Sequence, residues 1–117
     1  MRKCGVDMHL KGSARLVVTD ERGELPGAFG QGCALLLEGV EREHSLNRAA
    51  KSIGMAYSKA WRLVREAEAH LGVALLIRDG ARGSVLTEEG ARAVRSYRTL
   101  QLEIEQLIAR RLPEIFD

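Results

Sequence analysis

The 117-residue sequence has few aromatic residues, only two cysteines and no long apolar run. The cysteines, Cys4 and Cys33, match no metal-ligand spacing and are too few for a disulfide framework. No stretch approaches the roughly 18 apolar residues of a membrane span, and the first residues lead into no apolar signal region. We therefore expect a reduced, cytoplasmic protein with no membrane partner, and a single domain that spans residues 1–117.

Residue types that perform catalysis or bind metals are also scattered. His9, His44 and His70 form no Cys/His cluster with ligand spacing. The glycine-rich stretch 27–32 lacks the lysine of a phosphate-binding loop. We find no nucleophile motif and no paired carboxylates. The sequence predicts that the protein is not an enzyme and has neither a metal site nor a cofactor.

The net charge of +2 conceals an uneven distribution along the chain. Residues 45–85 hold seven Arg and Lys against three Asp and Glu, whereas each flanking segment holds one more acid than base. Proteins that bind nucleic acids concentrate positive charge in this way, because neutralising phosphates supplies much of their affinity. The alternative is a set of ordinary solvated helix faces.

A pair of helices joined by a tight turn is predicted over residues 45–71. Ser45 is a suitable N-cap, Gly54 and Met55 form the turn, and Gly72 ends the second helix. The apolar residues of each helix recur at helical spacing: Leu46, Ala49, Ala50 and Ile53 in the first, and Ala60, Val64, Ala67 and Leu71 in the second. This is the helix-turn-helix unit, whose second helix enters the major groove of DNA.

Further elements are predicted on both sides of this unit. Alternating apolar residues indicate N-terminal β-strands within 6–26, and Cys33, Leu36, Leu37 and Val40 indicate a helix over 33–44. Residues 73–86 read as a β-hairpin with a polar tip at 79–84, which would be a wing. The predicted fold is mainly α with a small β component, a winged helix-turn-helix.

A long C-terminal helix is predicted over 87–112, with Thr87 as its N-cap and Pro113 ending it. At 1.5 Å a residue it would be about 37 Å long, more than a core of this size covers. Its apolar stripe follows coiled-coil spacing and predicts a homodimer, through Tyr97, Leu100, Ile104 and Leu107. In the alternative, the N-terminal strands cover part of the stripe.

Candidate DNA contacts lie on the second helix of the pair, at the start of the first, and at the wing tip. Arg62 is the first candidate for a bidentate contact to guanine, or else it forms an ion pair with Glu66 one turn on. Lys59 and Arg65 suit phosphates, and Trp61 either stacks on the DNA backbone or belongs to the core. The predicted contacts are Ser45, Asn47, Tyr57, Ser58, Lys59, Trp61, Arg62, Arg65, Arg82 and Ser84.

Each of the outer candidates has a simpler explanation. Ser45 and Asn47 lie at a helix N-terminus, where free amides suit a phosphate, although a cap alone accounts for Ser45. Arg82 and Ser84 would touch the minor groove or the backbone, unless the wing tip is a solvated turn. Asp79 beside them argues against tight packing on phosphate.

Several short motifs follow one another between residues 30 and 97. They are Ser45-Leu46-x-x-Ala49-Ala50-Lys51-x-x-Gly54-Met55, Tyr57-x-x-Ala60-Trp61, Leu71-Gly72, Leu75-Leu76-x-Arg78 and Leu86-Thr87-x-x-Gly90. Their order and spacing resemble the N-terminal DNA-binding domain of the molybdate-responsive ModE regulators. They are similar, more distantly, to the winged helix of LysR-type regulators. The resemblance implies a winged-helix fold and binding to double-stranded DNA.

The sequence departs from the ModE pattern at three positions and in its wing. Ala56 stands where the family usually has serine, Ser58 where it has lysine, and Cys33 where it has arginine. The wing is shorter and has fewer glycines. ModE regulators sense molybdate through a separate C-terminal domain, so the resemblance implies no oxyanion site in this chain.

These observations predict a transcription regulator that binds a two-fold operator as a homodimer without its own ligand-sensing domain. Two alternatives stay open: a protein-interaction module built on the same fold, and a non-specific architectural DNA-binding protein. A thiol switch at Cys4 or Cys33 is a further reading, although Cys33 is expected to be buried and inert.

Overall fold

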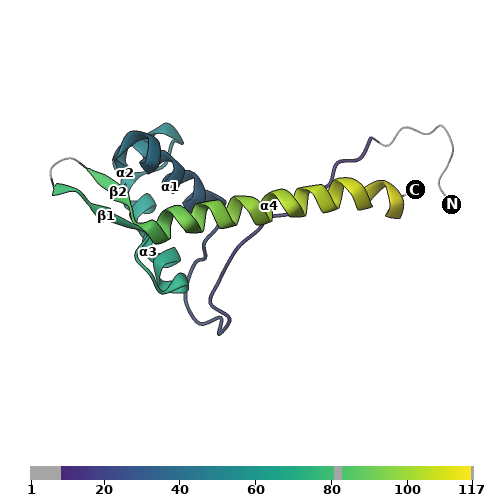
Figure 1. Cartoon of the computed structure of the whole chain (residues 1–117), viewed down its shortest axis with the longest axis horizontal. Helices are drawn as coiled ribbons and strands as arrows, with labels where there is room; N and C mark the ends of the chain where they lie inside the picture. Colours follow the sequence, from purple (N-terminus) through teal and green to yellow (C-terminus); the bar gives the residue numbers. More distant parts are fainter. Residues whose placement is uncertain (1–8, 81–82, 117) are drawn as a thin grey trace.

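The computed structural model describes residues 9–80 and 83–116, in which four helices and a two-stranded sheet are present (Figure 1). The elements are α1 (Gln31–Glu43), α2 (Leu46–Ser52), α3 (Tyr57–Leu71), β1 (Leu76–Arg78), β2 (Ser84–Leu86) and α4 (Glu88–Ile115). We call residues 19–97 the head. The part of α4 that projects from it, residues 98–115, is the rod (Figure 1). The molecule measures 62 × 33 × 23 Å, and the predicted class, mainly α with a small sheet, is confirmed.

The predicted helix ends are formed by the residues that the sequence indicated. The Ser45 hydroxyl accepts a hydrogen bond from the Arg48 amide at 3.1 Å, and the Thr87 hydroxyl accepts one from the Gly90 amide at 2.9 Å. Gly72 ends α3 in the left-handed region, with φ of 72°, where a residue without Cβ is least strained. The start of α1 differs, because the helix begins at Gln31, two residues earlier than expected.

The core of the head is built from the apolar faces that the spacing predicted. Its large, fully buried side chains come from every layer of the head: Phe29, Leu36, Leu37, Val40, Leu46, Val64 and Leu75. Ala49 and Ala50 of α2, and Ala60 and Ala67 of α3, are buried beside them. Small residues at these positions let the three helices approach one another closely, so the helix-turn-helix is held rigidly by the core.

The wing is a short antiparallel hairpin in which Leu76 faces Leu86 and Arg78 faces Ser84. It begins at Leu76, three residues later than predicted. The Ser84 amide donates a hydrogen bond of 3.0 Å to the carbonyl of His44, the C-cap residue of α1. A Cβ atom at Gly83 would collide with the same carbonyl oxygen, so glycine permits this approach. The hairpin is therefore tied to the end of α1.

The predicted N-terminal strands are wrong for the described part of 6–26. No strand forms between residues 9 and 26, and the ladder is reduced to one isolated bridge, in which Val18 and Phe29 exchange two backbone hydrogen bonds. Val6 and Met8 lie outside the described residues. Residues 9–18, which we call the strap, run in extended form beside α4 (Figure 1). Alternating apolar residues form a β-strand only where another strand pairs with them. Here the neighbouring element is the helix α4, so no ladder forms.

The strap covers one side of the rod. Gly12 lies directly against the Ile108 side chain, and the groove there is lined by residues 10–14 and by Glu105, Ile108, Leu112 and Pro113. Nearer the head, the Tyr97 hydroxyl donates a hydrogen bond of 2.8 Å to the Leu16 carbonyl. The alternative in which the N-terminal segment covers part of the long helix is therefore present in the structure.

Two expectations about α4 are corrected. Pro113 does not end the helix, which continues to Ile115. A proline removes one backbone donor and crowds the preceding turn, and the helix continues for only two residues beyond it. Tyr97 is only 3% exposed and its ring packs 5.3 Å from that of Phe29, so it belongs to the core of the head and is not available to a partner.

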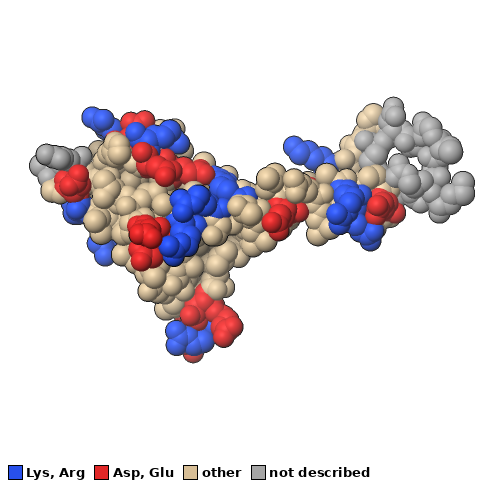
Figure 2. Space-filling model, viewed as in Figure 1, with Lys and Arg blue, Asp and Glu red and all other residues tan. Residues whose placement is uncertain are grey.

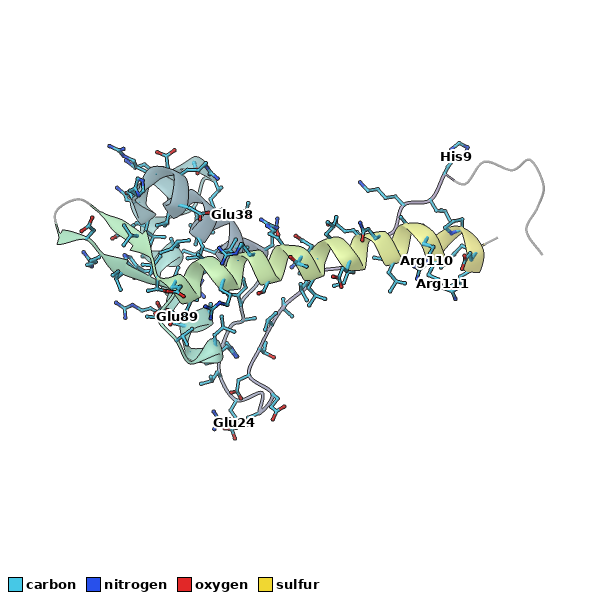
Figure 3. The ribbon with its side chains drawn as sticks, in the orientation of Figure 1. His9, Glu24, Glu38, Glu89, Arg110 and Arg111 are labelled. Carbon is cyan, nitrogen blue, oxygen red and sulfur yellow. The ribbon has the colours of Figure 1, made fainter. Side chains whose placement is uncertain are left out.

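The other predicted dimerisation residues lie on the rod. Leu100 is 45% exposed and Leu107 is 49% exposed, while Ile104 is half-buried. A bidentate ion pair fixes the root of the rod to α1: the Arg98 guanidinium donates two hydrogen bonds of 2.8 Å to the Glu38 carboxylate (Glu38 is labelled in Figure 3). These hydrogen bonds lower the pKa of Glu38 below its ordinary value, against the opposing effect of burial.

Candidate nucleic-acid interface

The turn between α2 and α3 presents the N-terminus of α3 at the surface. Gly54 adopts a φ of 69°, and the Met55 amide returns to the Ala50 carbonyl at 2.8 Å, which closes the turn. Ala56 takes the N-cap position of α3 without a side-chain hydrogen bond, as its replacement of the family's serine implied. The first amides of α3 are therefore left for solvent or for an acceptor from a ligand.

The outward face of α3 carries five of the predicted contact residues, and all five are exposed: Tyr57, Ser58, Lys59, Arg62 and Arg65. The opposite face, with Ala60, Val64 and Ala67, is fully buried. Because α3 is anchored along its whole length, its outward side chains are presented on a rigid support. Asn47, at the start of α2, is also exposed, and Ser45 beside it is half-buried and engaged as a cap.

Arg62 forms the ion pair that was the alternative to a base contact. Its guanidinium lies 3.4 Å from the Glu66 carboxylate one turn on, and the arginine side chain remains 57% exposed. Glu66 itself is only 19% exposed and packs against Gly27. Exposed pairs of this spacing contribute about 0.3–0.5 kcal/mol, so the pair holds Arg62 loosely.

Trp61 lies at the edge of α3 that faces the wing. It is half-buried and packs partly against the core. The guanidinium groups of Arg65 and Arg78 lie over its ring, 5.1 Å and 5.3 Å from the ring centroid. Each such cation–π contact at an exposed site is worth about 0.5–1 kcal/mol. Trp61 therefore packs partly on the core, as one of its two expected roles required, and its stacking on the DNA backbone stays a prediction.

The exposed side chains of the wing are not the ones that were predicted. Ser84 is only 5% exposed and paired within β2, so its side chain is not a tip contact. The reason is that the hairpin pairs one residue further towards its tip than the apolar pattern suggested. Arg82 lies outside the described residues. Arg78, the last residue of β1, is exposed and was not among the predicted contacts. Arg78 stands in the motif Leu75-Leu76-x-Arg78, but the motif does not reveal the contact with Trp61, which is distant in sequence.

Charges of both signs cover the face of the molecule drawn in Figure 2. No side of the head visible there is purely basic. The basic side chains of the described part of residues 45–85 lie on three elements, which are α2 with Arg48 and Lys51, α3 with Lys59, Arg62 and Arg65, and β1 with Arg78. Within the described residues, Arg65 and Arg78 form no ion pair with a carboxylate.

The described residues hold no group of His, Cys, Asp and Glu placed to bind a metal ion, and none of their helices is long and apolar enough to cross a membrane. His70 is buried and structural: Nδ1 accepts a hydrogen bond from the Asp20 amide at 2.8 Å, and Nε2 donates one to the Pro26 carbonyl at 3.0 Å. Burial raises the pKa of the Cys33 thiol to about 12, which agrees with the expected inert cysteine. Cys4 lies outside the described residues.

Known proteins with this arrangement bind DNA. The CbnR DBD in its crystal structure with DNA matches with a TM-score of 0.58 and 26% identity, over 73% of this chain and 95% of that one. The BenM DBD in complex with catB site 1 DNA matches with a TM-score of 0.55 and 24% identity, over 73% and 92% of the two chains. The fold and these matches define a winged-helix DNA-binding domain.

Sequence comparison finds similarity to two groups of bacterial proteins. Residues 35–91 match the family described as "Bacterial regulatory helix-turn-helix protein, lysR family". The chain is also 38% identical over 79 residues to the "Molybdenum transport protein ModE" of Azotobacter vinelandii. The aligned segment covers 64% of this chain and 29% of that protein. Both resemblances drawn from the motifs are confirmed. The chain spans less than a third of the length of the ModE protein that it matches.

Proposed function

We propose that this protein is a transcription regulator that places α3 in the major groove of double-stranded DNA and the wing against the adjacent backbone. The observation that carries the proposal is the outward face of α3, whose polar and basic side chains are exposed while the opposite face is locked into the core. A transcription regulator acts where the chromosome lies, so the proposal includes a cytoplasmic location.

Arg62 is assigned the main base contact. Its pair with Glu66 is weak and exposed, so a guanine edge with two acceptors can replace the carboxylate. Lys59 flanks it and is assigned to phosphate. Ser45 and Asn47, at the N-terminus of α2, are assigned to the backbone on the other side of the groove.

The first test is a salt titration of affinity for random-sequence duplex DNA, followed by selection of preferred sequences. About six phosphate contacts predict a log–log slope near −5. Arg62→Ala should lower affinity for the selected site by about 1–3 kcal/mol and relax the preference at one position. Arg110→Ala, which removes the same charge at the far end of the rod (Figure 3), is the matched control and should change neither.

Three outcomes separate the alternatives. A flat salt response with unchanged mobility of the duplex would end the proposal, and recovery of a protein partner would then favour the protein-interaction module. A steep slope with no selected sequence would identify an architectural DNA-binding protein. A steep slope with a selected site that Arg62→Ala relaxes would support the regulator.

The proposal includes a homodimer formed through the rod. Leu100, Ile104 and Leu107 recur at coiled-coil spacing on the side left open by the strap, and two of the three are nearly half exposed. Leu107→Glu should convert the dimer to a monomer in sedimentation velocity, whereas Gln106→Glu adds the same charge one residue away and should not. A monomeric wild type would exclude the dimer while leaving DNA binding to be judged by the titration.

A further inference from the structure

The ring of Trp61 links α3 to the wing. Trp61 lies on α3, Arg65 follows it by one turn, and Arg78 ends β1 of the wing. Both guanidinium groups lie over the indole, at 5.1 Å and 5.3 Å from its centroid. The Tyr57 ring packs edge-on against the same indole, with the centroids 6.3 Å apart and the planes at 83°. Four side chains from two elements therefore form one cluster.

The two arginines of the cluster differ from Arg62, on the same face of α3, in how they are held. Arg62, Arg92 and Arg98 each lie within 3.4 Å of a carboxylate oxygen. Among the described residues, no carboxylate forms an ion pair with Arg65 or Arg78, although Asp79 follows Arg78 in the chain. An aromatic ring orients a guanidinium through its face and leaves the N–H donors at its edge free. Arg65 and Arg78 are thus positioned without being neutralised.

The position of the cluster indicates what those donors meet. A helix in the major groove and a hairpin against the adjacent backbone lie on either side of one sugar-phosphate strand. Side chains at the junction of helix and hairpin face that strand. A guanidinium edge with several donors matches the oxygens of a phosphate. The junction therefore offers two oriented, unpaired cations to the backbone of the duplex.

We propose that Arg65 and Arg78 act together as a phosphate clamp on one DNA strand, and that Trp61 is the positioning residue that holds both. The proposal rests on the proposed function and deepens it, because it assigns the helix–wing junction to the backbone and adds Arg78 to the interface. Trp61 need not touch DNA in this arrangement. Its indole N–H is buried without a hydrogen-bond acceptor in the described structure, so the ring, rather than its polar atom, performs the role.

The test is a double-mutant cycle on Arg78 and Trp61, measured as duplex affinity and as the slope of affinity against salt. Arg78→Gln should weaken binding about ten-fold for all sequences and reduce the slope by about 1. Trp61→Leu should cause a comparable or larger loss, because both arginines lose their support. In the Trp61→Leu background, Arg78→Gln should cost less than three-fold, which is the non-additivity expected of coupled residues.

Control variants separate positioning from folding. Trp61→Phe keeps an aromatic face and removes the unpaired N–H, so it should retain most of the affinity and the full salt slope. Arg110→Gln, at the far end of the rod, removes the same charge away from the junction and should leave the slope unchanged. Circular dichroism and the midpoint of urea unfolding establish that each variant is folded before its affinity is compared.

Trp61 is the sole tryptophan of the chain, so its fluorescence reports on the junction directly. Adding duplex DNA should change the emission of the wild type, and this change should be smaller in Arg78→Gln. If the wild type binds with a steep slope but Arg78→Gln and Arg65→Gln leave affinity and slope unaltered, the clamp is wrong while the proposed function stands. If the wild type does not bind, the proposed function itself is wrong.

Discussion

The head and the rod of this protein differ in how their apolar side chains are shielded from water. In the head, Leu37 and its neighbours are fully buried within one chain. On the rod, Leu100 and Leu107 keep nearly half of their surface exposed, and the strap covers only the side around Ile108. The head is therefore specified by its own residues. The rod, in contrast, has an apolar surface left over for a second molecule.

The largest expected effect is on the stability of the head. Leu37→Ala removes a fully buried side chain and should lower the free energy of unfolding by about 2–5 kcal/mol. The loss should not depend on protein concentration, since all of the contacts lie within one chain. Urea unfolding at several protein concentrations measures it.

Leu107→Ala is the matched control on the rod. Its effect should be small in dilute solution and should appear only at concentrations where a dimer forms. A loss of several kcal/mol that is independent of concentration would contradict the division into a self-sufficient head and an open rod.

A smaller effect is expected at the joint between the two regions. Hydrogen bonds from Arg98 lower the pKa of Glu38, so their stabilisation is present above the ordinary Glu pKa of about 4.3 and is lost as the pH falls through the lower folded value. Glu38→Gln should lower the free energy of unfolding by about 1 kcal/mol or less at neutral pH, because the pair is partly exposed.

The pH dependence is the discriminating part of that experiment. The difference between wild type and Glu38→Gln should shrink as the pH falls through the lowered folded pKa of Glu38, below which the carboxylate is protonated in both states. Glu103→Gln, an exposed carboxylate on the rod, is the control. A difference that stays constant between neutral and acidic pH would show that the pair does not stabilise the joint.

The smallest effect is expected at the thiol inside the head. With a pKa raised to about 12 by burial, Cys33 should stay unmodified in mild peroxide at neutral pH. A Cys4→Ser variant leaves Cys33 as the sole thiol, and mass spectrometry detects its oxidation. Rapid modification in the folded protein would mean that the head opens readily and would revive the thiol switch.

Much of the head could be predicted because its signals are local. Ser45, Thr87 and Gly72 mark helix ends through bonds to their own neighbours, and these marks were confirmed. The repeat of Ala60, Val64 and Ala67 placed α3 at its observed bounds. Local propensity and tertiary packing agree at these positions, which is typical of a well-specified fold.

The wrong predictions concern residues whose surroundings are set by contacts with distant parts of the sequence. The spacing of Tyr97 fits a dimer stripe, but the backbone of the strap and the ring of Phe29 enclose it. The strap alternates like a strand, yet Leu16 and Val18 pack on the head without a sheet. The contact of Arg78 with Trp61, 17 positions earlier in the sequence, is also long-range, and although each residue stands in a family motif, neither motif encodes the pairing.

The bond between the Ser84 amide and the His44 carbonyl has a consequence for selectivity. It fixes the hairpin, at the Arg78–Ser84 pair next to its tip, to the end of α1, so the interval between the hairpin and α3 is set while the chain folds. The conformational entropy of that junction is then lost on folding and not on binding, which favours a higher affinity for DNA. A duplex whose groove width does not suit this fixed interval must itself deform, and its stiffness becomes part of what the protein discriminates.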